Sequence, residues 1–228
     1  MPASDGWSAA AAALPTAARA ERERPFWSAL AVALGWRRVA DAGCGSGFHV
    51  ALLRGLGIET VGFDVALGVV RDGAGALVGD VGRPPLRNGA FDAALCLGNT
   101  ISLLPSRREQ ARALAALAGL LRPGGTLLIQ GEDVGAMLAS GPVVRARTLA
   151  DGAVHVRVFE RRGRRVRMLA GVAREGGESP LEPTTLLPTP RRALTRVAGA
   201  LGLRSRALPS APPGGGATWW VALSAPSP

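Results

Sequence analysis

The fold of this chain is decided by the stretch Val39-Ala-Asp-Ala-Gly-Cys-Gly-Ser-Gly-Phe-His49. A short apolar run ends in Asp41, and glycines follow at alternate positions, Gly43, Gly45 and Gly47. A helical pattern then begins at Phe48. Glycine permits a positive φ and lets a ligand approach the bare backbone. Because the loop stands between a strand and a helix, its amide groups lie at the mouth of a sheet, which predicts a nucleotide-like ligand.

The spacing of the glycines distinguishes between two classes of ligand. A dinucleotide-binding fingerprint has glycines at its first, third and sixth positions. Counted from Gly43, the sixth position is Phe48, so the NAD-type pattern is incomplete. The pattern D-x-G-C-G-x-G resembles motif I of class I S-adenosylmethionine-dependent methyltransferases. The resemblance implies contacts to the methionine part of that cofactor from Asp41, Gly43, Cys44, Gly45 and Gly47. A purely structural turn, with an Asp41 carboxylate that only holds the loop amides, is the alternative.

Two further acidic residues follow predicted strands in the same half of the chain. The segment 58–64 reads as a strand that ends in Asp64, about 20 residues after the first glycine, where a doubly wound fold places a carboxylate for the ribose hydroxyls. The segment 76–80 reads as a third strand ending in Asp80, and the resemblance implies that it faces the adenine. Val65 and Val81 are expected beside them. Helix capping by Asp64 and ordinary turn chemistry at Asp80 are the alternatives.

The segment Phe91–Thr100 resembles motif IV of the methyltransferase family, the strand end beside the transferred methyl group. This resemblance implies that Leu97 and Gly98 contact the cofactor and that Asn99 positions the reactants, unless Asn99 only caps the turn. The segment 120–130 resembles the proline-glycine-glycine turn that enters strand five, and Pro123-Gly-Gly125 is expected to end the preceding helix.

The region after the fourth predicted strand resembles one group of enzymes within this family. Cys96-Leu-Gly-Asn-Thr100, with Leu103-Leu-Pro105 behind it, is similar to glycine and sarcosine N-methyltransferases. Those enzymes continue after strand five with an aromatic-bearing acidic segment, whereas this chain reads Gln130-Gly-Glu-Asp-Val134. The resemblance therefore implies methylation of a small molecule but not of a particular amino acid.

The alternation of elements predicts an α/β fold with a mostly parallel sheet covered on both faces. We expect strands at 37–42, 58–63, 76–80, 91–97 and 126–130, and helices at 48–56, 66–72 and 106–121. The resemblance implies a Rossmann-like, doubly wound, seven-stranded sheet in which the last strand, 218–224, runs antiparallel between strands five and six. Residues 1–20 are predicted to be a flexible segment and 21–228 the methyltransferase domain, in which a helix at 21–34 lies over the cofactor cleft or merely covers a sheet edge.

Between strands five and six the period of the sequence changes to two. Apolar and polar residues alternate on both sides of Arg161-Arg-Gly-Arg164, which predicts a small β-hairpin at 154–173. We interpret 143–188 as a substrate-covering insertion, with a proline-rich linker from Pro180 to Pro190. Thr189 is expected to be the N-cap of the next helix, which strand six follows at 204–208.

The composition of the chain says less about function than the motifs do, but it bears on partners, location and metal binding. The chain has 228 residues and a net charge of +10, but all 27 basic residues are arginines, a bias more typical of a GC-rich coding sequence than of nucleic-acid binding. Neither of the two cysteines is placed like a disulfide partner, and no apolar run reaches the about 18 residues of a membrane span, so we expect a cytoplasmic protein without membrane contact. Two histidines and two scattered cysteines predict no metal site.

Three functions are compatible with these patterns. The first is methyl transfer from S-adenosylmethionine to nitrogen or oxygen of a small molecule by in-line displacement, which leaves S-adenosylhomocysteine and needs alignment more than a catalytic triad. The second is an RNA methyltransferase that uses the arginines of the predicted hairpin: Arg157, Arg161, Arg162, Arg164, Arg165 and Arg167. No Asn/Asp-Pro-Pro-aromatic quartet for amino groups on bases follows strand four. The third is a non-catalytic relative that acts through protein contacts.

Overall fold

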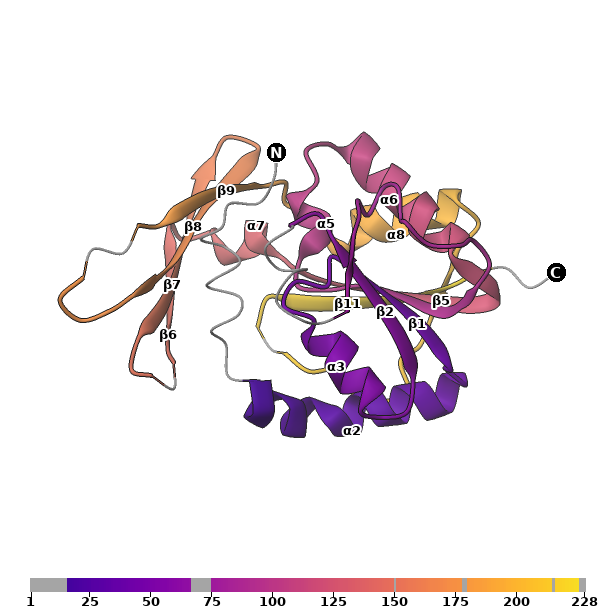
Figure 1. Ribbon diagram of the computed structural model, residues 1–228. Helices are drawn as coiled ribbons and strands as arrows, with labels where there is room; N and C mark the ends of the chain where they lie inside the picture. Colours follow the sequence, from indigo (N-terminus) through magenta and orange to yellow (C-terminus); the bar gives the residue numbers. More distant parts are fainter. Residues whose placement is uncertain (1–15, 67–74, 150, 178–179, 215, 226–228) are drawn as a thin grey trace.

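The centre of the molecule is a seven-stranded sheet with the strand order β10-β11-β5-β4-β1-β2-β3 (Figure 1). The computed structural model describes residues 16–66, 75–149, 151–177, 180–214 and 216–225. The strands β1 to β5 pair in parallel, whereas β11 is antiparallel to both β5 and β10. The predicted doubly wound fold with its antiparallel last strand is therefore confirmed. The strands are β1 Arg38–Ala42, β2 Glu59–Asp64, β3 Leu77–Val78, β4 Phe91–Cys96, β5 Leu121–Glu132, β10 Arg204–Arg206 and β11 Thr218–Ser224.

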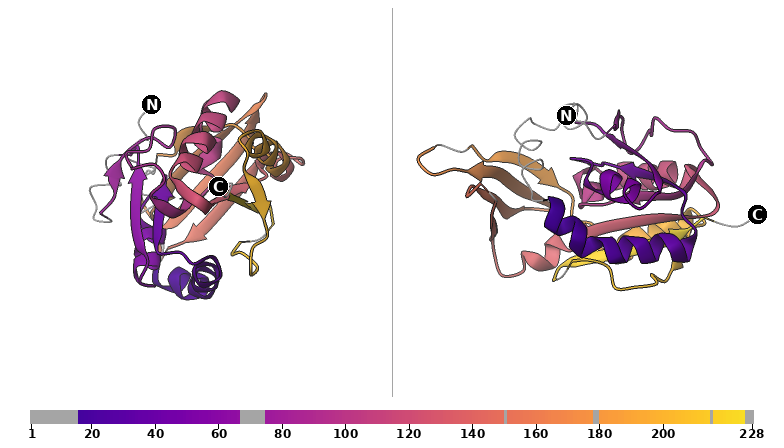
Figure 2. Two further views of the ribbon diagram at one scale, coloured as in Figure 1. Left: turned by 90° about the vertical axis from the view of Figure 1, so that its right-hand side faces the viewer. Right: turned by 60° about the horizontal axis from the view of Figure 1, so that its bottom comes forward.

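Helices cover both faces of this sheet (Figures 1 and 2). The helices α2 (Thr16–Leu34) and α3 (Phe48–Arg54) pack on one face, and α6 (Arg107–Gly119) and α8 (Arg191–Ala200) pack on the other. Neighbouring residues of β1 divide accordingly, since Val39 joins the core under α2 and Ala40 the core under α6. This alternation follows from the pleat of a strand. In the part of the chain that the structure describes, no helix has the length and apolarity that a membrane span requires.

A second, antiparallel sheet with the order β6-β7-β8-β9 stands beside the first one (Figure 1). Its strands are β6 Val143–Thr148, β7 Val154–Arg162, β8 Arg165–Ala173 and β9 Glu182–Leu186. The expected hairpin is thus the central pair of a larger sheet. The predicted proline linker is wrong in part, because Pro183 lies in β9, where it pairs with Leu169. A separate apolar core joins this sheet to Val134 of α7 (Val134–Met137) and to Leu138.

Several predicted boundaries are corrected by packing and pairing. Residues 16–20, expected to be flexible, begin α2, while residues 1–15 and most of the predicted helix at 66–72 lie outside the described residues. The strand expected at 76–80 is reduced to Leu77–Val78, and the strand expected at 204–208 ends at Arg206. An additional short helix, α5 (Thr100–Leu103), follows β4.

The ends of two helices also differ from the prediction. The helix α6 ends at Gly119, and Pro123-Gly-Gly125 lies inside β5, whose pairing with β4 begins at Leu121 and shifts register near this turn. Thr189 is not the N-cap of α8; Pro190 holds that position. The Thr189 hydroxyl instead accepts hydrogen bonds from Gln110 (2.8 Å) and Arg107 (3.1 Å), so its side chain is bonded to α6 rather than to the start of α8.

A buried carboxylate attaches α2 to the glycine-loop helix α3. Glu23 is only 5% exposed, and its oxygens lie 2.7 Å from Nε of Arg19, 3.3 Å from Nε1 of Trp27 and 3.7 Å from Nε2 of His49. Burial alone would raise the pKa of Glu23, but these three partners outweigh it and lower the pKa to about 2. Glu23 is therefore ionised and paired, and α2 lies over the start of α3.

We predict that Glu23→Gln lowers the free energy of unfolding by about 1–3 kcal/mol at pH 7, because charged hydrogen bonds are replaced by weaker neutral ones. A carboxyl whose pKa is lowered on folding stabilises above its ordinary pKa of 4.5, and this contribution is lost as the pH falls toward 2. Urea unfolding between pH 3 and 7 measures this. The difference in free energy of unfolding between Glu23→Gln and the unmodified protein should become smaller as the pH is lowered. The exposed Glu21→Gln is the control; equal losses in both variants would contradict the prediction.

Candidate active site

The glycine loop that joins β1 to α3 is fixed by the end of β2. The main-chain amides of Gly43 and Cys44 donate to the carbonyl oxygen of Phe63 at 2.8 and 3.1 Å. The φ angle of Gly43 is 71°, and a Cβ atom there would lie 2.6 Å from Cγ2 of Thr100 in α5. Only glycine fits this position without displacing a neighbour, so the loop lies in close contact with the start of α5.

Asp64, at the end of β2, holds the loop. Its carboxylate accepts hydrogen bonds from the amide of Gly45 (3.0 Å) and from the amide of Ala66 (2.9 Å). The role of holding a loop amide, considered for Asp41 from the sequence, thus belongs to Asp64.

Asp41 is buried, and one of its two carboxylate oxygens is left unpaired by the described part of the chain. It is 1% exposed, and its Oδ2 atom has no hydrogen-bond partner among the described residues. Burial raises the pKa of Asp41 to about 6, against an opposing effect of His49 and with a further increase from Asp64. A buried carboxylate oxygen without a donor is costly and rare, so this atom is available to a donor group of a ligand.

The turn after β4 carries unusual backbone geometry. Gly98 and Asn99 have φ angles of 65° and 67°, and Asn99 is the only non-glycine residue with a positive φ in the described ranges. The amide of Gly98 donates to Oε1 of Gln130 at 2.6 Å. The Oδ1 atom of Asn99 accepts from the hydroxyl of Ser102 at 2.7 Å and from the amide of Glu132 at 3.3 Å. Strained backbone of this kind persists where surrounding bonds enforce it and is concentrated at functional sites.

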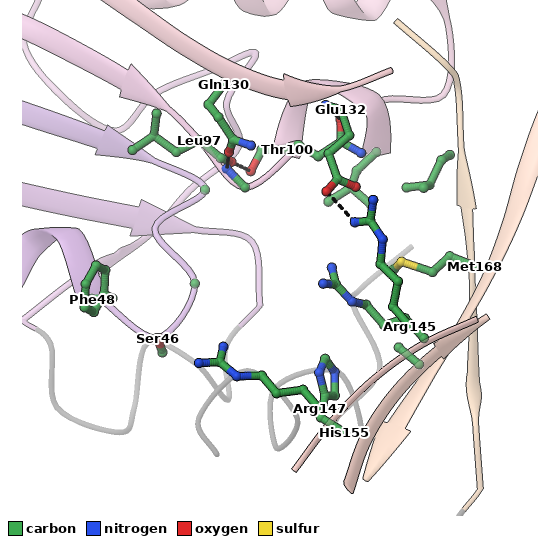
Figure 3. Close-up of a pocket in the computed structure, with 18 of the residues that line it drawn as sticks. Ser46, Phe48, Leu97, Thr100, Gln130, Glu132, Arg145, Arg147, His155 and Met168 are labelled. Carbon is green, nitrogen blue, oxygen red and sulfur yellow. Dashed lines mark hydrogen bonds and ion pairs between the residues drawn. The ribbon is translucent and has the colours of Figure 1, made fainter. Parts of the chain in front are cut away.

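A cavity of about 820 Å³ joins these two loops to the second sheet (Figure 3). Seven of the residues predicted for the site line it: Asp41, Gly43, Cys44, Gly45, Leu97, Gly98 and Asn99. Asn99 therefore both lines the cavity and holds the turn. Five predicted residues do not line it: Gly47, Asp64, Val65, Asp80 and Val81.

Of the candidate residues after β2 and β3, Asp80 and Val81 are engaged locally. The Oδ1 atom of Asp80 accepts from the amide of Gly82 at 2.5 Å, which is the turn chemistry considered as its alternative. Val81 is 7% exposed and packs in the core under α6, whereas Val65 is 50% exposed. Their assignment to the ribose and adenine therefore stays a prediction.

Sequence reasoning missed most of the far wall of the cavity. This wall contains Gln130 and Glu132 from β5, Arg145 and Arg147 from β6, and His155 and Arg157 from β7. The arginines at alternate positions of β6 were the available signal, since they predict a strand with one charged face. His155 has a lowered pKa, because it is partly buried and lies near Arg157 and Arg147.

Neither cysteine is suited to act as a nucleophile. Burial raises the pKa of Cys96 to about 12, and burial next to Asp41 and Asp64 raises the pKa of Cys44 well above its usual range. Both thiols are therefore protonated at neutral pH. Among the described residues, no group of three or more His, Cys, Asp or Glu side chains is placed to hold a metal ion.

The fold and the site together define a Rossmann-like domain with a nucleotide-type glycine loop. Residues 40–129 match the family model described as a methyltransferase domain. A glycine/sarcosine N-methyltransferase of Parasynechococcus marenigrum is 30% identical over 142 residues, which cover 56% of this chain and 49% of that protein. A tRNA U34 carboxymethyltransferase of Methylococcus capsulatus is 32% identical over 133 residues, which cover 51% of this chain and 40% of that protein. The chain spans about half or less of the length of these curated relatives.

A solved structure supports the same fold over almost the whole chain. A sugar N-methyltransferase from Streptoalloteichus sp ATCC 53650 matches with a TM-score of 0.69 at 24% identity, covering 93% of this chain and 89% of that one. With the match of residues 40–129 to the methyltransferase domain model, this likeness shows that the chain is similar to S-adenosylmethionine-dependent methyltransferases and shares their fold.

We predict that Asp41→Asn increases the stability of the ligand-free protein at pH 7 by up to about 3 kcal/mol. The pKa of Asp41 rises from 3.8 to about 6 on folding, and one pKa unit corresponds to about 1.4 kcal/mol. A carboxyl with a raised pKa stabilises below its unfolded pKa, and this contribution is lost as the pH rises through 6.

Urea unfolding from pH 4 to 8 tests this, and the gain from Asp41→Asn should disappear toward pH 4. Asp64→Asn is the matched control, because its carboxylate accepts two amide hydrogen bonds and its loss should destabilise. An Asp41→Asn variant that is no more stable than the unmodified protein at pH 7 would refute the account.

Proposed function

We propose that this chain transfers a methyl group from S-adenosylmethionine to a nitrogen or oxygen atom of a small molecule. The observation that carries the proposal is the single cavity shared by the glycine loop, the strained turn after β4 and the second sheet. Its volume, about 820 Å³, is within the range of small-molecule sites.

The residues of the loop fit the methionine part of the cofactor. An ammonium group is a strong donor, and the buried Oδ2 atom of Asp41 is an acceptor without a partner among the described residues. We assign Gly43, Cys44, Gly45 and Gly47 to the same part of the cofactor. The pKa of about 6 keeps Asp41 mostly ionised at neutral pH, as this role requires.

The remaining assignments concern the nucleoside and the reacting group. Asp64 and Val65 are proposed to hold the ribose, since each carboxylate oxygen has a second lone pair besides the one used by an amide. Asp80 and Val81 are proposed to lie near the adenine, and Leu97 and Gly98 beside the cofactor at the end of β4.

When bound, S-adenosylmethionine would supply an electrophilic methyl group for a lone pair of the acceptor, with its sulfur as the leaving group. The chain's own residues align the acceptor and exclude water. Asn99 is proposed as a positioning residue, because its left-handed backbone directs the turn into the cavity. Alignment of this kind lowers a barrier by about 7–11 kcal/mol, so the proposal requires no Ser-His-acid set.

A small acceptor is favoured over RNA because three of the exposed hairpin arginines are engaged within the chain and a fourth arginine faces the cavity. Arg161 donates to the carbonyl of Gly135, Arg162 pairs with Glu160 and Arg165 donates to the carbonyl of Pro105. Arg157 lines the cavity. The curated relatives include enzymes named for glycine and for tRNA, and a cavity of about 820 Å³ is of a size that fits the former type of substrate.

Calorimetry with S-adenosylhomocysteine tests the cofactor site. We expect binding by the unmodified protein and affinities reduced about tenfold to a hundredfold by Asp41→Asn and by Asp64→Ala, since a charged hydrogen bond contributes about 1.5–3 kcal/mol. Homocysteine release should then identify the acceptor in pooled metabolites rather than in total tRNA. Absence of binding, or equal binding by both variants, contradicts the proposal; binding without any methyl transfer points to the non-catalytic reading.

A further inference from the structure

One half of the inner face of the second sheet is cationic. Arg145 and Arg147 alternate along β6, and His155 and Arg157 alternate along β7. In the register of the two strands Arg145 lies opposite Arg157, and Arg147 lies opposite His155. All four residues line the cavity (Figure 3). The sheet therefore gathers four nitrogen-bearing side chains on the wall that faces the glycine loop.

This arrangement is unfavourable in the free protein. Like charges directly opposite each other on paired strands repel. Burial lowers the pKa of Arg157, and Arg145 and Arg147 lower it further against the opposing charge of Glu132. Burial and the two arginines Arg157 and Arg147 also lower the pKa of His155. The fold thus maintains a crowded positive charge that its own stability does not require.

Only part of this charge is compensated within the described chain. Arg145 pairs with Glu132 at 2.6 Å. Arg147 and Arg157 form no ion pair or hydrogen bond with another described residue. In Figure 3, Arg147 and His155 extend into the cavity, and the guanidinium group of Arg147 points toward Ser46 of the glycine loop.

The other half of the same face is apolar. Phe159, Met168, Ala170 and Leu186 are buried and also line the cavity. Guanidinium groups that are unpaired, directed into a concave site and bordered by apolar side chains are typical of recognition of a carboxylate or phosphate. A merely solvated strand face would direct its arginines outward, as β8 does with the exposed Arg165 and Arg167.

We propose that this face of β6 and β7 is an anion subsite, in which Arg147 and Arg157 bind a carboxylate or phosphate group of the methyl acceptor. The proposal rests on the proposed function and adds the chemical class of its substrate. Arg145, held by Glu132, orients this subsite from its edge. The anion would anchor one end of the acceptor at the second sheet and leave its nucleophilic atom directed toward the turn at Asn99.

Anion binding can be measured without an acceptor. The protein, saturated with S-adenosylhomocysteine, is titrated with sodium pyrophosphate or with sodium succinate at constant ionic strength while its thermal unfolding is followed. We expect at least one of the two ions to raise the melting temperature. Arg147→Gln and Arg157→Gln should each weaken the apparent affinity about tenfold or more. Arg167→Gln, on the outer face of β8, is the matched control and should bind as the unmodified protein does.

The choice of ion identifies the source of the charge, because pyrophosphate alone indicates a phosphate-bearing acceptor and succinate alone a carboxylic acid. If Arg157→Gln does not fold, the proposal is tested by the anion affinity of Arg147→Gln alone, because the side chain of Arg147 is exposed. No stabilisation by either ion, or equal weakening by Arg167→Gln, overturns the proposal. Retention of total tRNA that is lost equally in all three variants overturns it in favour of an RNA surface. Intact binding of S-adenosylhomocysteine in these cases leaves the methyltransferase function standing, whereas absence of that binding refutes the function first.

Discussion

The carbonyl oxygen of Phe63, at the end of β2, is the point on which the site depends. It accepts hydrogen bonds from the amides of both Gly43 and Cys44, and the next residue, Asp64, accepts from the amide of Gly45. Three consecutive amides of the loop are thereby held by the neighbouring strand rather than by the strand that precedes the loop. Because Asp64 performs this task, the Oδ2 atom of Asp41 remains buried and without a hydrogen-bond partner in the described chain. The loop is therefore held in place by β2, and the Asp41 carboxylate beside it can accept a hydrogen bond from a ligand.

A second set of contacts makes the additional sheet part of the site. The amide of Glu132 donates to Asn99, and the carboxylate of the same residue pairs with Arg145 on β6. The amide of Leu187, just after β9, donates to the carbonyl of Ser102 at 2.7 Å. The strained turn after β4 is thus bonded to β5, and α5, which follows the turn, is bonded to the exit of the second sheet. A displacement of that sheet would therefore change the position of the turn where the reacting groups are proposed to meet.

The sequence was sufficient for the central strands β1, β2, β4 and β11, because they contain buried apolar residues and the loops carry recognisable glycines. It predicted β3 and β10 too long, and both of these strands are exposed. It was insufficient for β9, since Pro183 was interpreted as part of a linker. Proline is tolerated in an edge strand, and β9 is at the edge of its sheet. The strand β6 was not predicted from the sequence, for a different reason. Its arginines face a cavity, and a search for alternating apolar residues does not detect a strand whose inner face is charged.

The exchange of roles between Asp41 and Asp64 could not be predicted from the sequence. Asp64 is the last residue of a parallel strand and Asp41 the last but one of its neighbour, and both lie near the same loop. The difference arises from tertiary geometry, because the loop turns toward β2 and brings the amide of Gly45 to Asp64. Strand-end motifs therefore predict which residues gather at the sheet's mouth, but not which of them hold the loop and which remain available to a ligand.

The cavity has opposite charges at its two ends, and each of them is unfavourable without a ligand. Asp41 is a buried carboxylate at the glycine loop, and Arg147 and Arg157 are crowded cations at the second sheet. A cofactor with an ammonium group would relieve the first, and an acceptor with an anionic group would relieve the second. Such a field also orients a bound acceptor, because its anion is repelled from the loop and attracted to the sheet. The two charged ends thus leave the middle of the cavity, at the turn of Asn99, as the place where an uncharged nucleophile and the methyl group can meet.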